Sequence, residues 1–362
     1  MGRVFYCTRE SVQDAFDTKE AANRSAQIDA AIASASDDID GWLNRHKHGL
    51  APRTATRYFS WPVRSGVGGQ NPPSWRLWLD ENELISVTSL SAAGEAIAPA
   101  DYFLEPVNSG PPFTYIELDL SSNASFSNAG THQRAIEIVG VFGIGDDRSP
   151  AGILAEALDG SETAVDVSDA SLVGVGSVLV VEAERMLVTG RSALTTGQTL
   201  TTDMASLNSD REMTIASGAA VHQGETVTVD SERMLVLSVT GNTVQVQRGV
   251  QGSVLAEHLT GATVYADRTL TVERGALGST AAAHADGTAV QAWAVPDLVH
   301  DLCKAEAITR LEQEWSAYGA RVYSDEAERD SSGTEVVAGR GLTDLRKSCA
   351  RRYKRKFRKA AI

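Results

Sequence analysis

The sequence lacks most of the features that mark secreted or membrane-bound proteins. Its three cysteines, Cys7, Cys303 and Cys349, are odd in number and far apart. This spacing favours buried or idle thiols in a reducing compartment. No run approaches the roughly 18 consecutive apolar residues that can cross a bilayer, so we expect no membrane partner. The N-terminal segment has no apolar signal core, and we therefore expect no export signal.

Motifs of catalysis and of tightly bound cofactors are also missing. The sequence has no Gly-x-x-x-x-Gly-Lys-Ser/Thr phosphate loop and no Gly-x-Ser-x-Gly nucleophile elbow. The glycines of GVFGIGDD, residues 140–147, are not followed by the capped helix of a dinucleotide site. The acidic pairs Asp37–Asp38 and Asp146–Asp147 lack the alternating oxygen ligands of a calcium loop. We therefore expect no enzyme, no cofactor and no bound metal.

Positive charge is scarce over most of the chain and concentrated at its end. The formal net charge is −14. The last 17 residues, 346–362, hold nine Lys or Arg and no acidic residue, which leaves 24 basic against 47 acidic residues, or −23, for the rest. An acidic body repels DNA, whereas a basic tail attracts acidic protein surfaces or phosphate groups.

The period of the apolar residues changes along the chain and predicts an α+β fold. Residues 8–48 have a helical period, with Thr8 as the cap of a short helix. A second helix starts near Thr18 and carries one apolar stripe, Ile28–Leu43. Between about 57 and 143 the period becomes two, and short runs separated by turn clusters predict a small antiparallel sheet.

The second half of the chain changes from strands back to helices. Residues 163–293 are rich in Val, Thr, Gly and Ala, which predicts an all-β block. Pro296 opens a helix with an apolar stripe from Leu298 to Trp315, the polar segment 323–341 predicts a mobile loop, and a last helix begins near Thr343. We interpret residues 1–150 and 294–362 as one helical domain that includes the small sheet and is interrupted by the β block.

The β block contains an internal repeat. GSVLVVEAERMLVTG, residues 176–190, and GETVTVDSERMLVLS, residues 224–238, share Glu-Arg-Met-Leu-Val at an offset of 48 residues. The second copy continues to Arg248-Gly249 and His258, but the first copy stops after residue 200. Matching letters resume at Arg274-Gly275 and His284, at an offset of 26.

A nested duplication explains these offsets. One module, residues 163–202 and 268–293, is split by a complete second module, residues 203–267. The repeated residues are interpreted as structural: Met186/Met234 and Leu187/Leu235 as core, and Glu184/Arg274 and Glu232/Arg248 as one ion pair in each module. His258 and His284 suggest a metal site, but neither has a Cys or His partner at ligand spacing, so packed or surface histidines are favoured.

The order of these segments resembles the head–tail connector (adaptor) proteins of long-tailed bacteriophages. The resemblance rests on LISVTSL (84–90), DYFLEPVNSGPP (101–112) and EIVGVFG (137–143), between a long helix and a helix opened by proline. It covers about residues 1–150 and 294–362 and leaves out the β block. The fold that it implies is a helical connector core with a small antiparallel sheet, interrupted here by an all-β insertion of two nested modules.

The resemblance also implies a function, a location and partners. Connector proteins form a ring, expected to hold 12 subunits, beneath the portal protein of the virion. The ring extends the channel for genomic DNA without reading its sequence and binds a downstream tail-completion or stopper protein. Assembly is expected in the cytoplasm of the bacterial host. The segment that docks on the portal would be Leu342–Ile362, and the residues expected to dock are Leu342, Leu345, Arg346, Arg351, Arg352, Tyr353, Lys354, Arg355, Phe357 and Arg358.

Other interpretations remain open from the sequence. The basic tail, with its interleaved Tyr353 and Phe357, also fits a virion protein that binds nucleic acid, or a solvated chain end. The β modules could bind a capsid or a host glycan. However, Tyr265 is the only aromatic residue between 163 and 292, which disfavours glycan binding and favours a role in shape.

Overall fold

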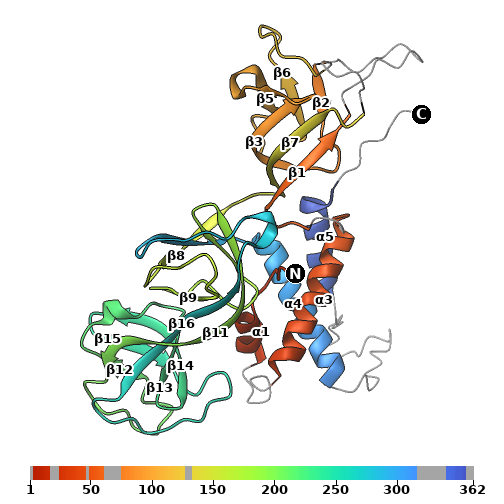
Figure 1. Ribbon diagram of the computed structural model, residues 1–362. Helices are drawn as coiled ribbons and strands as arrows, with labels where there is room; N and C mark the ends of the chain where they lie inside the picture. Colours follow the sequence, from red (N-terminus) through yellow and green to blue (C-terminus); the bar gives the residue numbers. More distant parts are fainter. Residues whose placement is uncertain are drawn as a thin grey trace, which may run out of the picture. The chain divides into compact units, whose positions relative to one another are not determined.

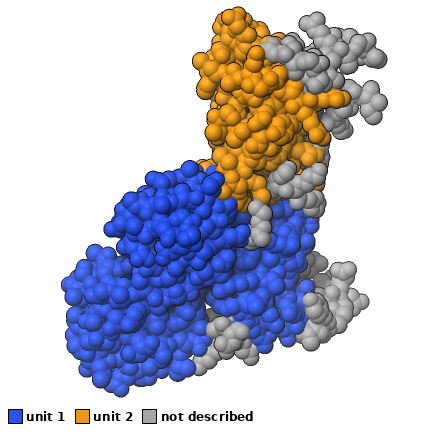
Figure 2. Space-filling view, in the orientation of Figure 1, with its two compact units in different colours: residues 1–42, 148–276, 280–353 blue, residues 43–147, 277–279, 354–362 orange. Residues whose placement is uncertain are grey.

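The computed structural model describes residues 3–16, 24–45, 49–60, 75–126, 133–315 and 340–355. The chain forms two compact units, which Figure 2 colours separately. The first comprises residues 1–42, 148–276 and 280–353, and the second residues 43–147, 277–279 and 354–362. Most of the predicted loop 323–341 lies outside the described residues, and its last two residues already belong to a helix.

Helices from both ends of the chain pack together in the first unit. The described residues contain α1 (Arg9–Phe16), α3 (Ser25–Trp42), α4 (Asp297–Trp315) and α5 (Arg340–Tyr353). They lie side by side (Figure 1), and α4 contacts each of the other three. Thr8 caps α1 as predicted, because its hydroxyl accepts the backbone N–H of Ser11 at 3.2 Å. None of the described helices has both the length and the apolarity that a bilayer-spanning segment needs.

The buried faces of the helices follow the predicted stripes, with one shift. The stripe Ile28–Ile39 of α3 is buried, as its period predicts. On α4 the most buried residues include Val299 and Cys303, whereas Leu298 and Ile308 of the predicted stripe are half-buried. The reason is that α4 has α3 and α5 as neighbours, so its contact surface is wider than one stripe.

The second unit contains two antiparallel sheets, where the sequence predicts one. The strands are β1 (Arg53–Phe59), β2 (Arg76–Trp78), β3 (Leu84–Ala92), β4 (Glu95–Ile97), β5 (Tyr102–Glu105), β6 (Tyr115–Leu118) and β7 (Ile136–Phe142). Their orders are β1-β7-β3-β4 and β2-β6-β5. One core takes buried residues from both sheets. Alternation in the sequence could not separate the sheets, because each strand has the same period whichever sheet it joins.

The β block forms one large antiparallel sheet. Its strands are β8 (Arg148–Ile153), β9 (Ala164–Asp166), β10 (Val178–Val181), β11 (Glu184–Thr199), β12 (Glu212–Thr214), β13 (Thr226–Val229), β14 (Glu232–Thr240), β15 (Thr243–Gln247), β16 (Thr263–Glu273) and β17 (Ala289–Trp293). The order is β12-β15-β14-β13-β16-β11-β10-β17-β8, and β9 also pairs with β16.

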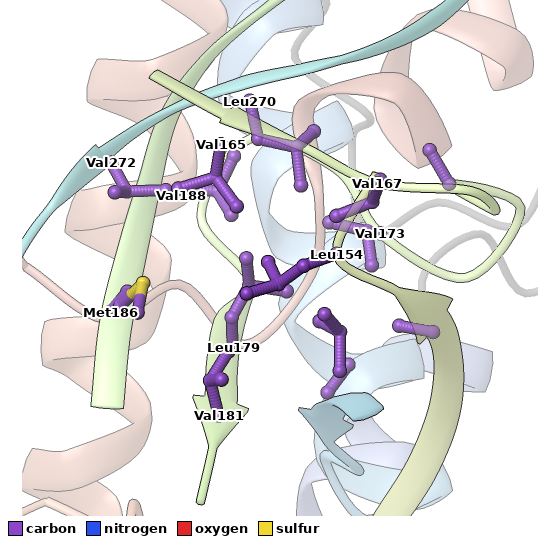
Figure 3. Close-up of a cluster of buried hydrophobic side chains, with 14 of the residues drawn as sticks. Leu154, Val165, Val167, Val173, Leu179, Val181, Met186, Val188, Leu270 and Val272 are labelled. Atoms are coloured by element: carbon purple, nitrogen blue, oxygen red, sulfur yellow. The ribbon is translucent and has the colours of Figure 1, made fainter. Parts of the chain in front are cut away.

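This sheet surrounds two hydrophobic cores. The first draws on residues 151–188 and 270–292 (Figure 3), and the second on residues 200–266. We call the parts around these cores module 1 and module 2. Met186 and Met234 are fully buried in their respective cores, as predicted. The first core begins at Ala151. Module 1 therefore starts earlier than the predicted residue, 163.

Two long strands connect the modules. β11 has 16 residues and β16 has 11, and the two strands pair with each other through three register shifts. The first half of β16 also pairs with β13 of module 2, and its second half with β9 of module 1. The expected boundary between residues 267 and 268 therefore falls inside a strand.

Replacing residues 193–268 by the dipeptide Asn-Gly should leave module 1 folded. Ser192 and Thr269 are paired across β11 and β16, so a two-residue turn can join them as a hairpin. The replacement removes no residue of the first core. Circular dichroism and urea denaturation of the shortened chain should show a β signal and a cooperative transition. Aggregation or a non-cooperative transition would contradict the expectation.

Candidate functional site

A buried carboxylate lies at the centre of module 2. Glu232 begins β14, and its side chain is completely buried. Arg248 donates to both of its oxygens from Nε and Nη2, each at 2.7 Å. The backbone N–H groups of Gly249 and Ala256 donate at 3.0 and 2.9 Å. Nε2 of His258 lies 2.9 Å away. The carboxylate therefore has five hydrogen-bonding contacts in a region without solvent.

The guanidinium of Arg248 holds two loops at this carboxylate. Its Nη1 donates to the carbonyl oxygens of Ala205 at 3.1 Å and Asp210 at 3.0 Å. Its Nη2 also donates to the carbonyl oxygen of Ala256 at 2.5 Å. Arg248 is followed by Gly249 with φ +64°, a conformation that glycine adopts without strain. The repeated Arg-Gly dipeptide thus combines an ion pair with the turn that follows it.

His258 connects the carboxylate to a tight turn. The ring is fully buried, and its Nδ1 lies 2.7 Å from the carboxylate of Asp230. Asp230, with φ +53°, is in the two-residue connection between β13 and β14. Of the two interpretations favoured by the sequence, a packed or a surface histidine, the structure shows the packed one.

Module 1 contains the same cluster, residue for residue. Glu184 accepts from Arg274 Nε and Nη2 at 2.8 and 2.9 Å, and from the backbone of Gly275 and Ala282, each at 3.0 Å. His284 Nε2 lies 2.9 Å from Glu184. The offsets are 48 for the glutamates and 26 for the other positions, as in the sequence. The predicted ion pairs Glu184/Arg274 and Glu232/Arg248 are therefore confirmed.

The contacts determine the ionisation of the two central glutamates. Burial of the Glu232 carboxylate by itself would raise its pKa, but hydrogen bonds from Arg248, Ala256 and His258 outweigh burial and lower the pKa to about 2. The same balance, with Arg274 as the strongest donor, lowers the pKa of Glu184 to about 2. Both glutamates are thus anions at any ordinary pH, paired with guanidinium groups.

A third cluster joins the two modules. Asp169, His222 and Glu225 place possible metal-ligand atoms within 4.8 Å of one another. However, Arg268 donates to Glu225 at 2.7 and 2.8 Å, and its Nη2 lies 3.1 Å from Nδ1 of His222. Burial alone would raise the pKa of Glu225, but hydrogen bonding and attraction to Arg268 lower it. The guanidinium thus supplies the positive charge, and the arrangement is an ion pair at the module junction.

The C-terminal helix α5 is attached to the helical bundle by one side. Cys349 is fully buried, and Leu342, Leu345 and Tyr353 are half-buried. Arg346 donates from Nε to the buried Glu306 of α4 at 2.5 Å.

Arg346 also contacts a second helix of the bundle. Its guanidinium lies 4.7 Å from the ring centre of Trp42 on α3. The hydrogen bond that Arg346 donates to Glu306 outweighs the effect of burial and raises the pKa of Arg346. One residue of the expected docking set therefore binds within its own chain.

Three cations of α5 are exposed to solvent. Lys347 and Arg351 are four residues apart and exposed, and so is Arg352. The guanidinium of Arg352 lies 5.4 Å from the ring centre of Tyr353. Lys347 also lies 3.9 Å from the exposed carboxylate of Asp344. We call the exposed cations Lys347, Arg351 and Arg352, the last two of which are predicted docking residues, the α5 basic face.

The remaining docking residues differ in their exposure. Lys354 is exposed, whereas Arg355 is largely buried and pairs with Glu83 of the second unit at 3.3 Å. Phe357 and Arg358 lie outside the described residues.

Neither a protein-family model, nor a curated protein, nor a solved structure matches this chain.

Sequence reasoning missed the acidic residue on the far side of each histidine. Asp230 in module 2 and Glu182 in module 1 both face the Nδ1 atom of the histidine, at 2.7 and 3.0 Å. A signal was present, because an acidic residue precedes each repeated glutamate by two positions. The contact between Glu306 and Arg346 had no comparable signal, since 40 residues separate the two in sequence.

Replacing Glu232 by alanine should lower the free energy of unfolding by about 3–5 kcal/mol, because Arg248 would remain buried without its counter-charge. Urea denaturation measures the loss. Glu257, an exposed neighbour in sequence, offers the control, since its replacement by alanine should change stability by about 0.5 kcal/mol at most. Equal losses of unfolding free energy in the two variants would show that the buried ion pair stabilises the protein no more than an exposed glutamate does.

Acidification should destabilise the β modules in a defined range of pH. A carboxylate whose pKa is lowered by folding stabilises the protein above its ordinary value, here 4.5, and this contribution is lost as pH falls towards about 2. Urea midpoints should therefore decline across this range. The urea midpoint of the double variant Glu184→Gln/Glu232→Gln should decline less steeply with falling pH. The exposed pair Glu156→Gln/Glu257→Gln is the control and should retain the slope of the unaltered chain.

Proposed function

We propose that this chain is a structural virion protein, a head-to-tail connector that forms a ring between the portal and the tail-completion proteins. The observation that carries the proposal is the α5 basic face, on a helix that is attached to the bundle through Cys349 and Arg346. A helix held in this way can present cations in a defined direction to an acidic surface. The sequence resemblance over residues 1–150 and 294–362 supplies the candidate surface, that of the portal.

The charge distribution supports the part of the proposal that concerns the channel. Apart from residues 346–362, the chain carries a formal charge of −23. A ring of such subunits repels the phosphate backbone, so that DNA can pass without being bound. The helical bundle, built from both ends of the chain, supplies the side surfaces through which neighbouring subunits of a closed ring would pack.

The β modules support a role in shape. Their strongest polar groups, Glu184/Arg274 and Glu232/Arg248, are buried and bind one another. Such groups stabilise loops and do not offer reactive or ligand-binding chemistry at the surface. We therefore assign the modules to the outside of the ring, as an insertion between β7 and α4 that fills space or spaces neighbouring proteins.

Reversing two charges on the α5 basic face should weaken binding to the portal protein encoded with this chain. Arg351→Glu/Arg352→Glu removes the attraction and introduces repulsion, and we expect an affinity at least about tenfold lower, with a weaker dependence on salt. Co-sedimentation and titration calorimetry at two salt concentrations measure the change. Arg134→Glu/Arg211→Glu alters the same net charge at two exposed positions elsewhere and is the matched control.

The same experiment separates the connector from the nucleic-acid alternative. Unchanged portal binding by Arg351→Glu/Arg352→Glu would reject docking through α5. If this variant instead lost affinity for duplex DNA, with a steep salt dependence in the unaltered chain, the basic face would be a nucleic-acid surface. Equal losses of portal affinity in the variant and the control would indicate attraction by net charge alone.

A further inference from the structure

Two of the three thiols meet inside the helical bundle. Sγ of Cys7 lies 3.4 Å from Sγ of Cys303, although 296 residues separate the two in sequence. Cys7 belongs to the extended segment before α1, and Cys303 lies in the middle of α4. Both side chains are buried. The sequence predicts idle thiols, but this contact places two sulfurs close to the separation at which they can react with each other.

Polar groups around the pair distinguish its two sulfurs. Oγ of Ser36 on α3 lies 3.4 Å from Sγ of Cys303 and accepts the backbone N–H of Tyr6 at 3.2 Å. Burial would raise the pKa of Cys303, but hydrogen bonds from Cys7, Ser36 and the backbone outweigh it and lower the pKa. The hydrogen bond to Cys303, together with burial, raises the pKa of Cys7. In this contact Cys7 donates to Cys303, which favours the thiolate form at Cys303.

A cavity adjoins one member of this pair, Cys7. It has a volume of about 420 Å³ and lies between the N-terminal segment and module 1, both in the first unit. Cys7 and Trp293 contribute to its wall, together with Glu10 and Arg191. Hydrogen peroxide is small enough to enter this space. Cys303 is not part of the wall, so peroxide would approach the pair from the side of Cys7.

We propose that Cys7 and Cys303 are a modification site at which a peroxide forms an intramolecular disulfide. The inference rests on the contact of the two sulfurs, their burial and the adjoining cavity, and it is independent of the proposed function. The bond would connect the segment before α1 to α4 and thus tie the two ends of the chain together within the bundle.

The reaction balances with peroxide as the oxidant. The thiolate of Cys303 attacks one peroxide oxygen, the O–O bond breaks, and the departing hydroxide takes up a proton to leave as water. Cys303 is then a sulfenic acid. The sulfur of Cys7 attacks the sulfur of Cys303, the S–O bond breaks, and the oxygen leaves as a second water with the proton from Cys7. Two thiols are oxidised by two electrons in total, and one peroxide is reduced to two water molecules.

Peptide mapping of the oxidised, full-length chain tests the proposal. The reduced protein is treated with hydrogen peroxide, its remaining thiols are alkylated in denaturant, and it is digested without reductant for mass spectrometry. We expect a cross-linked peptide containing Cys7 and Cys303, and an alkylated Cys349. Cys349 is the internal control, because it is a buried thiol whose pKa burial raises to about 11.

Variants and stability complete the test. Cys349→Ser should retain the cross-link, Cys7→Ser should lose it, and the oxidised unaltered chain should unfold several degrees higher than the reduced chain. The map of the unaltered chain does not depend on the folding of any variant. A cross-link to Cys349, a disulfide between two chains, or no Cys7–Cys303 peptide under conditions that oxidise the urea-unfolded chain would overturn the proposal.

Discussion

The β block depends on the requirement that a buried charge must be paired and hydrogen-bonded. Glu232 meets this requirement through the guanidinium of Arg248, two backbone N–H groups and a histidine. Arg248 in turn binds the carbonyl groups of two loops. Because an unpaired charge at this position would cost several kcal/mol, the loops can close in one arrangement only. The same solution in module 1 explains why the letters of the motif recur although most of the surrounding sequence differs.

A related ion pair attaches the last described helix, α5, to the helical bundle. Glu306 on α4 is buried and accepts from Arg346, whose guanidinium also covers Trp42 on α3. This contact attaches α5 to the bundle, and Lys347, Arg351 and Arg352 remain exposed. These exposed cations, on a helix that the bundle holds, are the basis of the connector proposal.

The internal repeat made much of the β block predictable. An offset of 48 for Glu184/Glu232 and of 26 for Arg248/Arg274 predicted both ion pairs, because oppositely charged residues that recur together are candidates for a contact within each copy. The prediction failed where the copies join. β16 runs from module 2 into module 1 without a break, and no local pattern shows that one strand serves two cores. In the second unit, similarly, alternation predicted strands but not their distribution between two sheets.

By itself, the sequence determined the α+β composition, the cap at Thr8, the buried stripe of α3 and the buried partners of the repeat, because each depends on local periodicity or on letters that recur at a constant offset. The meeting of Cys7 with Cys303 and of Glu306 with Arg346, and the separation of α5 into an attached and an exposed side, were decided by the tertiary structure. These contacts join residues with no shared pattern, and only the packing of α4 against α5 and against the N-terminal segment brings them together.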